Sequence, residues 1–251
     1  MILVGLTGAI QHGKNSFADA LLHEQTNGVH LESSAIITET IDKMHATLPR
    51  PVEPQNIDWV NNWLTHLPNI LKETVHVDTS FEKLQITKEA IYKRPIEYQK
   101  LFAHTKQLAE HTDDLVLPIT AATKSRHRPL LQWLGGYLVT AVGAGIWFDE
   151  IAWRAKTAEE NGTELFVVSG LRYPSDENIL RRINAHIVKI VRPDLPETDI
   201  NDPTERSRNA ITPDTTIINN GTLDDLFTVS KNYLNDIVTS QPKKFYIAND
   251  K

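Results

Sequence analysis

The amino-acid sequence predicts an α/β fold of three layers, with a mainly parallel β-sheet and a helical insertion. Short, continuous apolar runs recur along the chain, and such runs are typical of strands buried on both faces of a parallel sheet. Segments with helical periodicity separate these runs, which favours βαβ units with right-handed crossovers. The first apolar run ends in a glycine-rich turn followed by a lysine, an order that indicates an anion site at the sheet edge.

The predicted elements alternate in type along the chain. Strands are expected at residues 2–6, 28–31, 115–119, 164–168, 186–191 and 215–218. Helices are expected at residues 16–24, 34–44, 129–160, 176–184 and 223–238. The last helix follows a turn that contains Gly221, and Asp224 and Asp225 lie near its N-terminus, where acidic side chains stabilise a helix.

Residues 40–112 interrupt this alternation. Prolines break the chain near residue 50, and amphipathic helical stretches follow at residues 57–75 and 95–111. We interpret residues 40–112 as a helical insertion, a candidate acceptor-binding lobe over the carboxyl edge of the sheet; the alternative is a helical layer without a ligand role. The core is then expected to comprise residues 1–39 and 113–240, with a loose tail at 241–251.

Bulk composition narrows the class of protein. The chain has 251 residues, of which 40% are apolar and 23% charged, with a net charge of −6. This charge argues against a general binder of nucleic acids or membrane surfaces, but it permits a local basic pocket. The absence of cysteine excludes disulfides and thiolate metal sites. No apolar run approaches the roughly 18 residues of a membrane span, and the N-terminus lacks a basic leader region, so a cytoplasmic protein is expected.

The strongest motif lies at residues 8–16. Gly8 and Gly13, followed by Lys14, fit the pattern G-x-x-x-x-G-K of a P-loop (the Walker A motif), in which backbone N–H groups face a phosphate and the lysine adds positive charge. Asn15 stands where the pattern has its first hydroxyl, and Ser16 follows it. We therefore predict nucleotide binding by Gly8, Ala9, Gln11, His12, Gly13, Lys14, Asn15 and Ser16.

Arginines elsewhere could hold the phosphates that a transfer reaction brings together. Arg172 follows the apolar strand at residues 164–168 and is expected on the same side of the sheet as the P-loop; the alternative is a surface arginine that ends a strand. Arg206 or Arg208 could close over the nucleotide from a polar segment, which could equally be a solvated loop.

A helix beginning near residue 129 offers a second group. Arg128 precedes it, the amide of Gln132 can donate and accept hydrogen bonds toward a base edge, and Trp133 could stack on a base or pack in the core.

Acidic candidates are fewer. Glu32 follows the second strand and could act as a base or bind Mg²⁺ through water; alternatively it caps the next helix. Asp176 is a second acid that could organise Mg²⁺. The histidines show no zinc-binding spacing.

Taken together, these stretches resemble the deoxynucleoside monophosphate kinase family best known from bacteriophages, within the wider group of P-loop nucleotide and dephospho-CoA kinases. The start Gly-Leu-Thr-Gly of the family is similar to residues 5–8, and its G-K-[DS]-T to residues 13–16. Its R-x-L-L-Q-x-L-G is similar to residues 128–135, and its closing I-x-N-x-G-[ST]-L-x-x-L to residues 217–226. Its D-V-R-[FY]-P is similar to residues 170–174, although Gly170 replaces the acid. Residues 40–112 contain no matching motif.

The resemblance implies a kinase that transfers the γ-phosphoryl group of ATP to a nucleoside or deoxynucleoside monophosphate, with Mg²⁺ as cofactor. Lys14 would hold the donor phosphates, Ser16 would lie near them or Mg²⁺, and Arg172 with Arg128 would bind the acceptor phosphate. Gln132 would read the base, and Arg206 or Arg208 would close from a lid. The alternatives are a dephospho-CoA or other small-molecule kinase, or a non-catalytic P-loop regulator. The expected partners are small nucleotides; the oligomeric state stays open, a homodimer included.

Overall fold

The computed structural model describes residues 1–23, 25–47, 57–77, 119–120, 122–141, 145–195 and 207–240. The chain divides into two compact units. Unit 1 comprises Met1–Leu31, Ala158–Glu177 and Asn184–Lys251, and unit 2 comprises Glu32–Thr157 and Asn178–Ile183.

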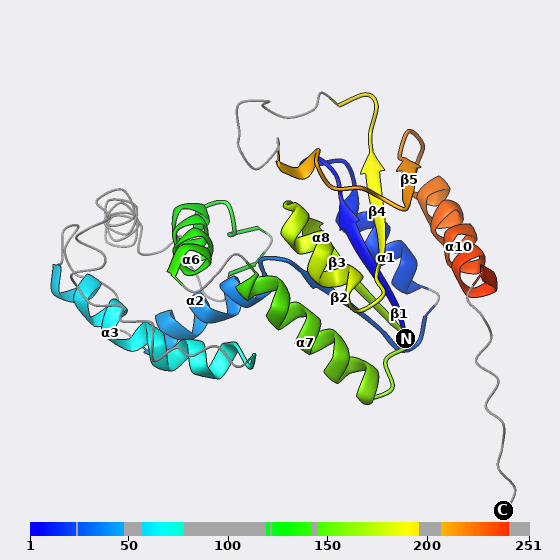
Figure 1. Ribbon diagram of the computed structural model, residues 1–251. Coiled ribbons are helices and arrows are strands. Elements are labelled where there is room, and N and C mark those ends of the chain that lie inside the picture. Colours follow the sequence, from blue (N-terminus) through cyan, green and yellow to red (C-terminus); the bar gives the residue numbers. More distant parts are fainter. Residues whose placement is uncertain are drawn as a thin grey trace, which may run out of the picture. The chain divides into compact units, whose positions relative to one another are not determined.

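A five-stranded parallel sheet organises unit 1, with strand order β2-β3-β1-β4-β5 (Figure 1). Its strands are β1 (Ile2–Thr7), β2 (Gly28–Glu32), β3 (Leu165–Leu171), β4 (His186–Val191) and β5 (Thr215–Ile218). Parallel pairing brings the carboxyl ends of neighbouring strands to one edge of a sheet, where ligands bind in open α/β folds. The fold class predicted from the sequence is therefore confirmed.

The described residues also form seven helices. These are α1 (Lys14–His23), α2 (Ala35–Thr47), α3 (Ile57–Thr74), α6 (Arg128–Ala141), α7 (Ile146–Glu160), α8 (Pro174–Arg181) and α10 (Leu223–Ser240). The helical stretch expected at residues 129–160 is two helices, α6 and α7. The strand expected at residues 115–119 and the helix expected at 95–111 fall largely or wholly outside the described residues, as does the tail at 241–251.

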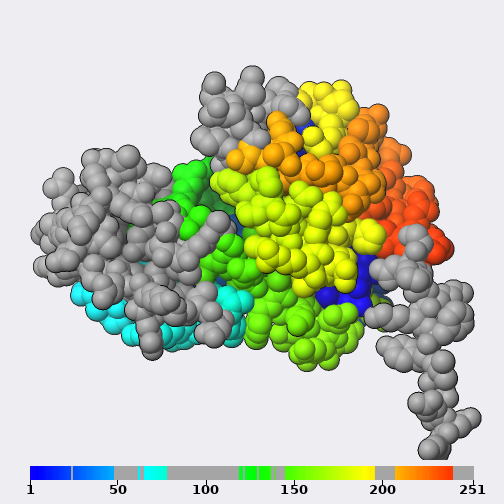
Figure 2. Space-filling model, in the orientation of Figure 1, coloured from blue at the N-terminus to red at the C-terminus, as the bar shows by residue number. Residues whose placement is uncertain are grey.

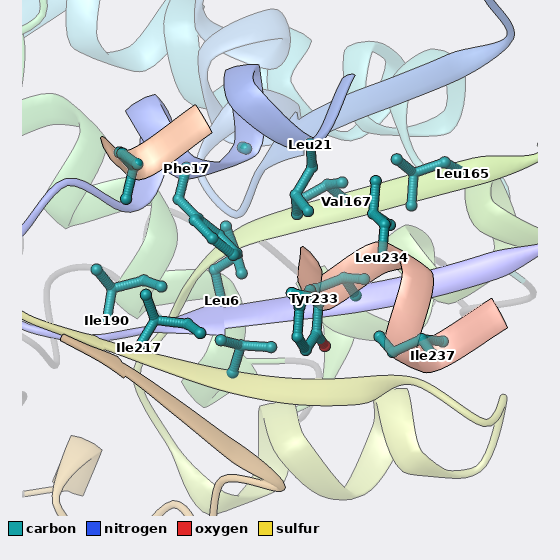
Figure 3. Packing of buried hydrophobic residues seen from close by; sticks show 14 residues of the cluster. Leu6, Phe17, Leu21, Leu165, Val167, Ile190, Ile217, Tyr233, Leu234 and Ile237 are labelled. Carbon is teal, nitrogen blue, oxygen red and sulfur yellow. The ribbon is translucent and has the colours of Figure 1, made fainter. Parts of the chain in front are cut away.

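The core of unit 1 lies between the sheet and the helices α1 and α10, which pack against each other (Figure 3). Phe17 of α1 is fully buried, and its ring centroid lies 6.0 Å from that of Tyr233 on α10. Buried side chains from four strands complete the cluster, among them Leu6, Val167, Val188 and Ile217. This apolar contact fixes α1, and therefore the loop that leads into it, against the sheet.

Only one face of α10 contributes to that core. Its buried residues Leu226, Tyr233, Leu234 and Ile237 recur at helical spacing, as expected for an amphipathic helix. The opposite face lies at the surface, coloured orange to red in Figure 2, and its Val238 is 59% exposed.

Unit 2 is helical where it is described, and α2 packs against both α3 and α6. A Cβ at Gly135 of α6 would lie 3.2 Å from Cδ1 of Ile37, so the absence of a side chain permits close approach of α6 to α2. The carboxylate of Glu150 on α7 is fully buried and accepts hydrogen bonds from His76 Nδ1 and Arg154 Nε, each 2.9 Å long. None of the described helices is long and apolar enough to cross a membrane.

We predict that Phe17→Ala lowers the free energy of unfolding by about 3–5 kcal/mol, because it opens a cavity between α1, α10 and the sheet. Val238→Ala on the exposed face of α10 is the control and should change this value by less than about 0.5 kcal/mol. Urea denaturation of both variants measures the difference. Equal effects of the two substitutions would contradict the packing described for Phe17.

Candidate active site

The loop between β1 and α1 has the backbone of an anion cradle. Three of its residues have positive φ angles: Gly8 at 140°, Gln11 at 66° and Gly13 at 96°. Loops in which left-handed residues interrupt right-handed ones form concavities lined by N–H groups. The N-terminus of α1 directly follows, since Phe17 N donates to Gly13 O at 2.9 Å. These features fit the phosphate cradle predicted for residues 8–16.

Close backbone packing explains both glycines. A Cβ at Gly8 would overlap the carbonyl oxygen of Ile190 in β4, and a Cβ at Gly13 would overlap Nδ2 of Asn219. Asn219 follows β5 directly, and its backbone N donates to Val191 O at 2.7 Å. At Gly8 the backbone of β4 leaves no room for a side chain, whereas at Gly13 the amide group of Asn219 would have to move aside.

His12 anchors the loop to the same strands. Its side chain is only 3% exposed, and its Nδ1 accepts a hydrogen bond of 3.1 Å from the backbone N of Arg192, which follows β4. Its carbonyl oxygen accepts a hydrogen bond of 3.0 Å from Asn219 Nδ2. The predicted contact of His12 with phosphate is therefore less favoured by the structure than a role in positioning the loop. Asn219 was not among the site residues predicted from the sequence, although it lies in the motif at residues 217–226.

The Lys14 ammonium lies on the loop itself. Its Nζ donates to Gly8 O at 2.8 Å and to Ala9 O at 2.7 Å. Two carbonyl acceptors hold the charge beside the cradle, where a phosphate would need it. Ser16 is half-buried in the first turn of α1, next to the exposed Asn15.

Arg172 lies at the same edge of the sheet as the loop, as predicted. The parallel register of β1 and β3 pairs Thr7 with Leu171, the last residues of the two strands, and Gly8 and Arg172 directly follow them. The Thr7 hydroxyl donates to Leu171 O at 3.1 Å and fixes this strand end. The Arg172 side chain is exposed, as binding a ligand phosphate would require.

Asp176 holds the backbone at Arg172. Its Oδ2 accepts hydrogen bonds of 2.9 Å from the backbone N atoms of Arg172 and Tyr173. Burial raises the pKa of this carboxyl group to about 6, against the lowering effect of those two hydrogen bonds. The side chain is 4% exposed and turned toward its own backbone, so the geometry favours a positioning role for Asp176 over the predicted organisation of Mg²⁺.

The backbone at Gly170 accounts for the absence of the acid that the family motif has at this position. It has a φ angle of 96°, and the register between β1 and β3 shifts between Leu6 and Thr7, opposite this residue. An irregularity of this kind with positive φ favours glycine over a residue with a Cβ atom. The backbone at this position is therefore unsuited to an aspartate.

In unit 2, α6 carries the other predicted acceptor residues. Arg128 and Gln132 are exposed and lie four residues apart, which places them on one face of the helix. Trp133 is fully buried, as are Leu130 and Leu134 on either side of it. Its prediction as a base-stacking residue is therefore corrected: the indole packs in the interior.

The remaining predicted residues differ in what the structure shows. Glu32 ends β2, and its Oε2 forms an ion pair with Lys124 and accepts a hydrogen bond of 3.4 Å from Ser34 Oγ. Arg208 is 6% exposed, so it is a buried residue of unit 1 and lacks the exposure of a lid arginine. Arg206 lies outside the described residues.

Comparison with known families gives one match. The family profile described as deoxynucleotide monophosphate kinase matches residues 63–229, which is more than half of the chain. The chain belongs to the deoxynucleotide monophosphate kinase family. A search of curated proteins found no match.

Membership in this family implies deoxynucleotide monophosphate kinase activity, and the chain is accordingly a phosphotransferase. No observation favours a dephospho-CoA kinase or a non-catalytic regulator. The matched range takes in residues 63–112, where no motif is recognisable by eye, and it begins after the loop at residues 8–16. Phosphate binding by that loop is therefore supported by the geometry of the loop alone.

A first prediction concerns the packing at Gly13. Gly13→Ala should cost more stability than Gly162→Ala, because both glycines have positive φ angles but only at Gly13 would a Cβ overlap a neighbour; at Gly162 the nearest atom, Asn27 Nδ2, would be 3.9 Å away. The strain alone costs about 1–3 kcal/mol. Adding Asn219→Ala to Gly13→Ala should recover part of the excess in a double-mutant cycle by urea denaturation. Strict additivity would contradict the contact.

A second prediction concerns Asp176. Because its pKa is raised from 3.8 to about 6 on folding, its contribution to stability is complete below about pH 4 and is lost as pH rises through 6. The loss amounts to about 3 kcal/mol. Asp176→Asn keeps an acceptor for both backbone N–H groups but cannot ionise, so its free energy of unfolding should not share this decline. Asp176→Ala should be less stable than Asp176→Asn at every pH. Identical pH profiles for the wild type and Asp176→Asn, from urea titrations at pH 4 to 8, would refute the assignment.

Proposed function

We propose that the chain transfers the γ-phosphoryl group of ATP to a deoxynucleoside monophosphate, with donor phosphates in the loop at residues 8–16 and the acceptor phosphate at Arg172. One observation carries this proposal: the cradle, its lysine and Arg172 share the carboxyl edge of two paired strands. Transfer between two phosphates needs cations on both sides of the moving group, because negative charge spreads over its oxygens in the transition state.

The donor side uses main-chain groups for binding and one side chain for charge. The N–H groups of the loop and of the first turn of α1 would bind the β- and γ-phosphates. Lys14 would exchange its two carbonyl acceptors, Gly8 O and Ala9 O, for phosphate oxygens, a move that needs no change in the backbone. The buried His12 keeps the loop in place and takes no part in the chemistry.

Mg²⁺ fits this donor set. Ser16 lies in the first turn of α1, one residue after the position whose hydroxyl reaches the metal in the P-loop pattern, and it is the nearest hydroxyl that follows Lys14 in the chain. No three His, Asp or Glu side chains cluster as a metal site in the part of the chain that the structure describes. A single protein ligand with phosphate and water oxygens as the others is a common environment for Mg²⁺, which would neutralise charge on the transferred group.

The acceptor side is built around Arg172, whose guanidinium can bind a phosphate through two parallel hydrogen bonds. Contacts of Arg128 and Gln132 with the acceptor stay predictions from the family motif, and Gln132 can both donate and accept toward a base edge. An oxygen of the acceptor phosphate then bonds to the γ-phosphorus while the bond from that phosphorus to the β–γ bridging oxygen breaks. ADP leaves with the electron pair of that bond.

Location in the cytoplasm and assembly as a homodimer stay predictions from the sequence.

We predict that Lys14→Ala abolishes turnover with little loss of stability, because the half-buried side chain contributes charge rather than packing. Arg172→Ala should chiefly raise KM for the monophosphate and leave KM for ATP within about threefold, since its role is binding of one substrate. Release of ADP in a coupled assay, with a panel of ribo- and deoxynucleoside monophosphates, measures both.

The controls separate the two sides of the site. Arg182→Ala, which changes an arginine outside the proposed site, should leave both KM values unchanged. ATP binding without turnover of any monophosphate would reject the proposed reaction. Normal acceptor kinetics in Arg172→Ala would remove this residue from the acceptor site.

A further inference from the structure

A hydrogen-bonded chain of three side chains ends at Asn15, the residue after the loop lysine. Ser169 Oγ, near the end of β3, donates to Asn15 Oδ1 at 3.0 Å, and His30 Nε2 of β2 lies 2.8 Å from the same Oγ. Beyond it, Asp19 Oδ1 lies 3.8 Å from His30 Nδ1. The chain connects two strands of the sheet with the first turn of α1, and neither His30 nor Ser169 has a place in the proposed reaction.

The direction of these hydrogen bonds follows from their chemistry. A serine hydroxyl has one hydrogen, and an amide oxygen can only accept, so the hydrogen of Ser169 lies on the bond to Asn15. His30 must then donate from Nε2 to Ser169. Ser169 is 2% exposed, which keeps water from competing for either bond.

This arrangement orients the carboxamide of Asn15. Its oxygen is turned toward the buried Ser169, and the nitrogen, with two hydrogens, occupies the opposite end of the planar group on an exposed side chain. In the P-loop pattern this position supplies a hydroxyl oxygen to Mg²⁺. An N–H group cannot bind a cation, but it can donate to a phosphate oxygen.

We infer that Asn15 is a phosphate ligand through Nδ2 and not a metal ligand, and that Ser169 and His30 are positioning residues that hold it so. The inference rests on the proposed nucleotide site. It leaves Ser16 as the hydroxyl available to the metal, and it gives the loop a second side-chain donor beside Lys14. The nucleotide phosphates then meet the uncharged N–H donor of Asn15 at the position where the P-loop pattern has a hydroxyl that binds the metal.

Calorimetric titration of the full chain with ATP, in EDTA and in excess Mg²⁺, tests this inference. Loss of a phosphate donor should weaken binding with and without metal, so Asn15→Ala should lose about tenfold in both buffers. Asn15→Asp should lose still more in EDTA, because a carboxylate would face the phosphates. A loss confined to Mg²⁺ in Asn15→Ala, or tighter binding of MgATP by Asn15→Asp, would show a metal ligand and overturn the inference.

The positioning role has its own readout. Ser169→Ala should weaken ATP binding in both buffers by less than Asn15→Ala, and the double variant should bind no more weakly than Asn15→Ala alone. His30→Ala should likewise add nothing to Ser169→Ala. Ser230→Ala, a buried serine on α10 that donates to Phe227 O, is the matched control and should bind as the wild type does. Additive losses would mean that Ser169 and His30 act independently of Asn15, which would overturn this role.

Two further outcomes separate the inference from the proposal beneath it. A wild-type chain that binds no ATP in either buffer would reject the donor site and the inference together. A wild type that binds ATP, a Lys14→Ala variant that does not, and an Asn15→Ala variant equal to wild type would reject the inference alone. Thermal unfolding of each variant confirms that the titrated protein is folded.

Discussion

The contact between the Gly8 backbone and the end of β4 is the constraint on which the candidate site depends. Gly8 lies so close to Ile190 O that no Cβ atom fits between them, and its φ angle of 140° is one that other residues rarely adopt. The contact holds the loop against the strand ends. His12 can then accept a hydrogen bond from the backbone N of Arg192, and Asn219 can donate to the carbonyl oxygen of His12. Contacts within the protein thus determine where the N–H groups of the proposed phosphate site lie.

Acidic side chains near the candidate site also have partners within the protein. Two acidic side chains that the structure describes at strand ends have roles in the protein itself: Asp176 binds two backbone N–H groups, and Glu32 is paired with Lys124. At Gly170 the positive φ angle disfavours an acidic residue. The hydrogen-bonded chain from His30 through Ser169 ends at Asn15, whose carboxamide is uncharged. Carboxylates that are paired within the protein would oppose the phosphates of the proposed complex less strongly.

The sequence predicted the elements of unit 1 well, because each is encoded locally: apolar runs give the strands, and helical periodicity with flanking turns gives α1, α8 and α10. It also placed Arg172 at the edge that carries the loop, since parallel strands leave no other choice. It did not decide the burial of Trp133, because a tryptophan flanked by leucines is more often part of a core but can also stack on a base. Nor could it find His30 and Ser169, which lie 139 residues apart and meet only through strand pairing.

The position of Lys14 indicates why the proposed nucleotide site needs a rigid loop. The Lys14 ammonium is bound to Gly8 O and Ala9 O, so nucleotide binding as proposed would replace two neutral acceptors with charged ones and would need little reorganisation. That exchange works only if the carbonyl groups stay in place when the lysine leaves them. They do so because Gly8 is fixed against β4, and His12 is held from both sides by groups that follow β4 and β5. Rigidity of the scaffold and mobility of one side chain are therefore two requirements of the same step.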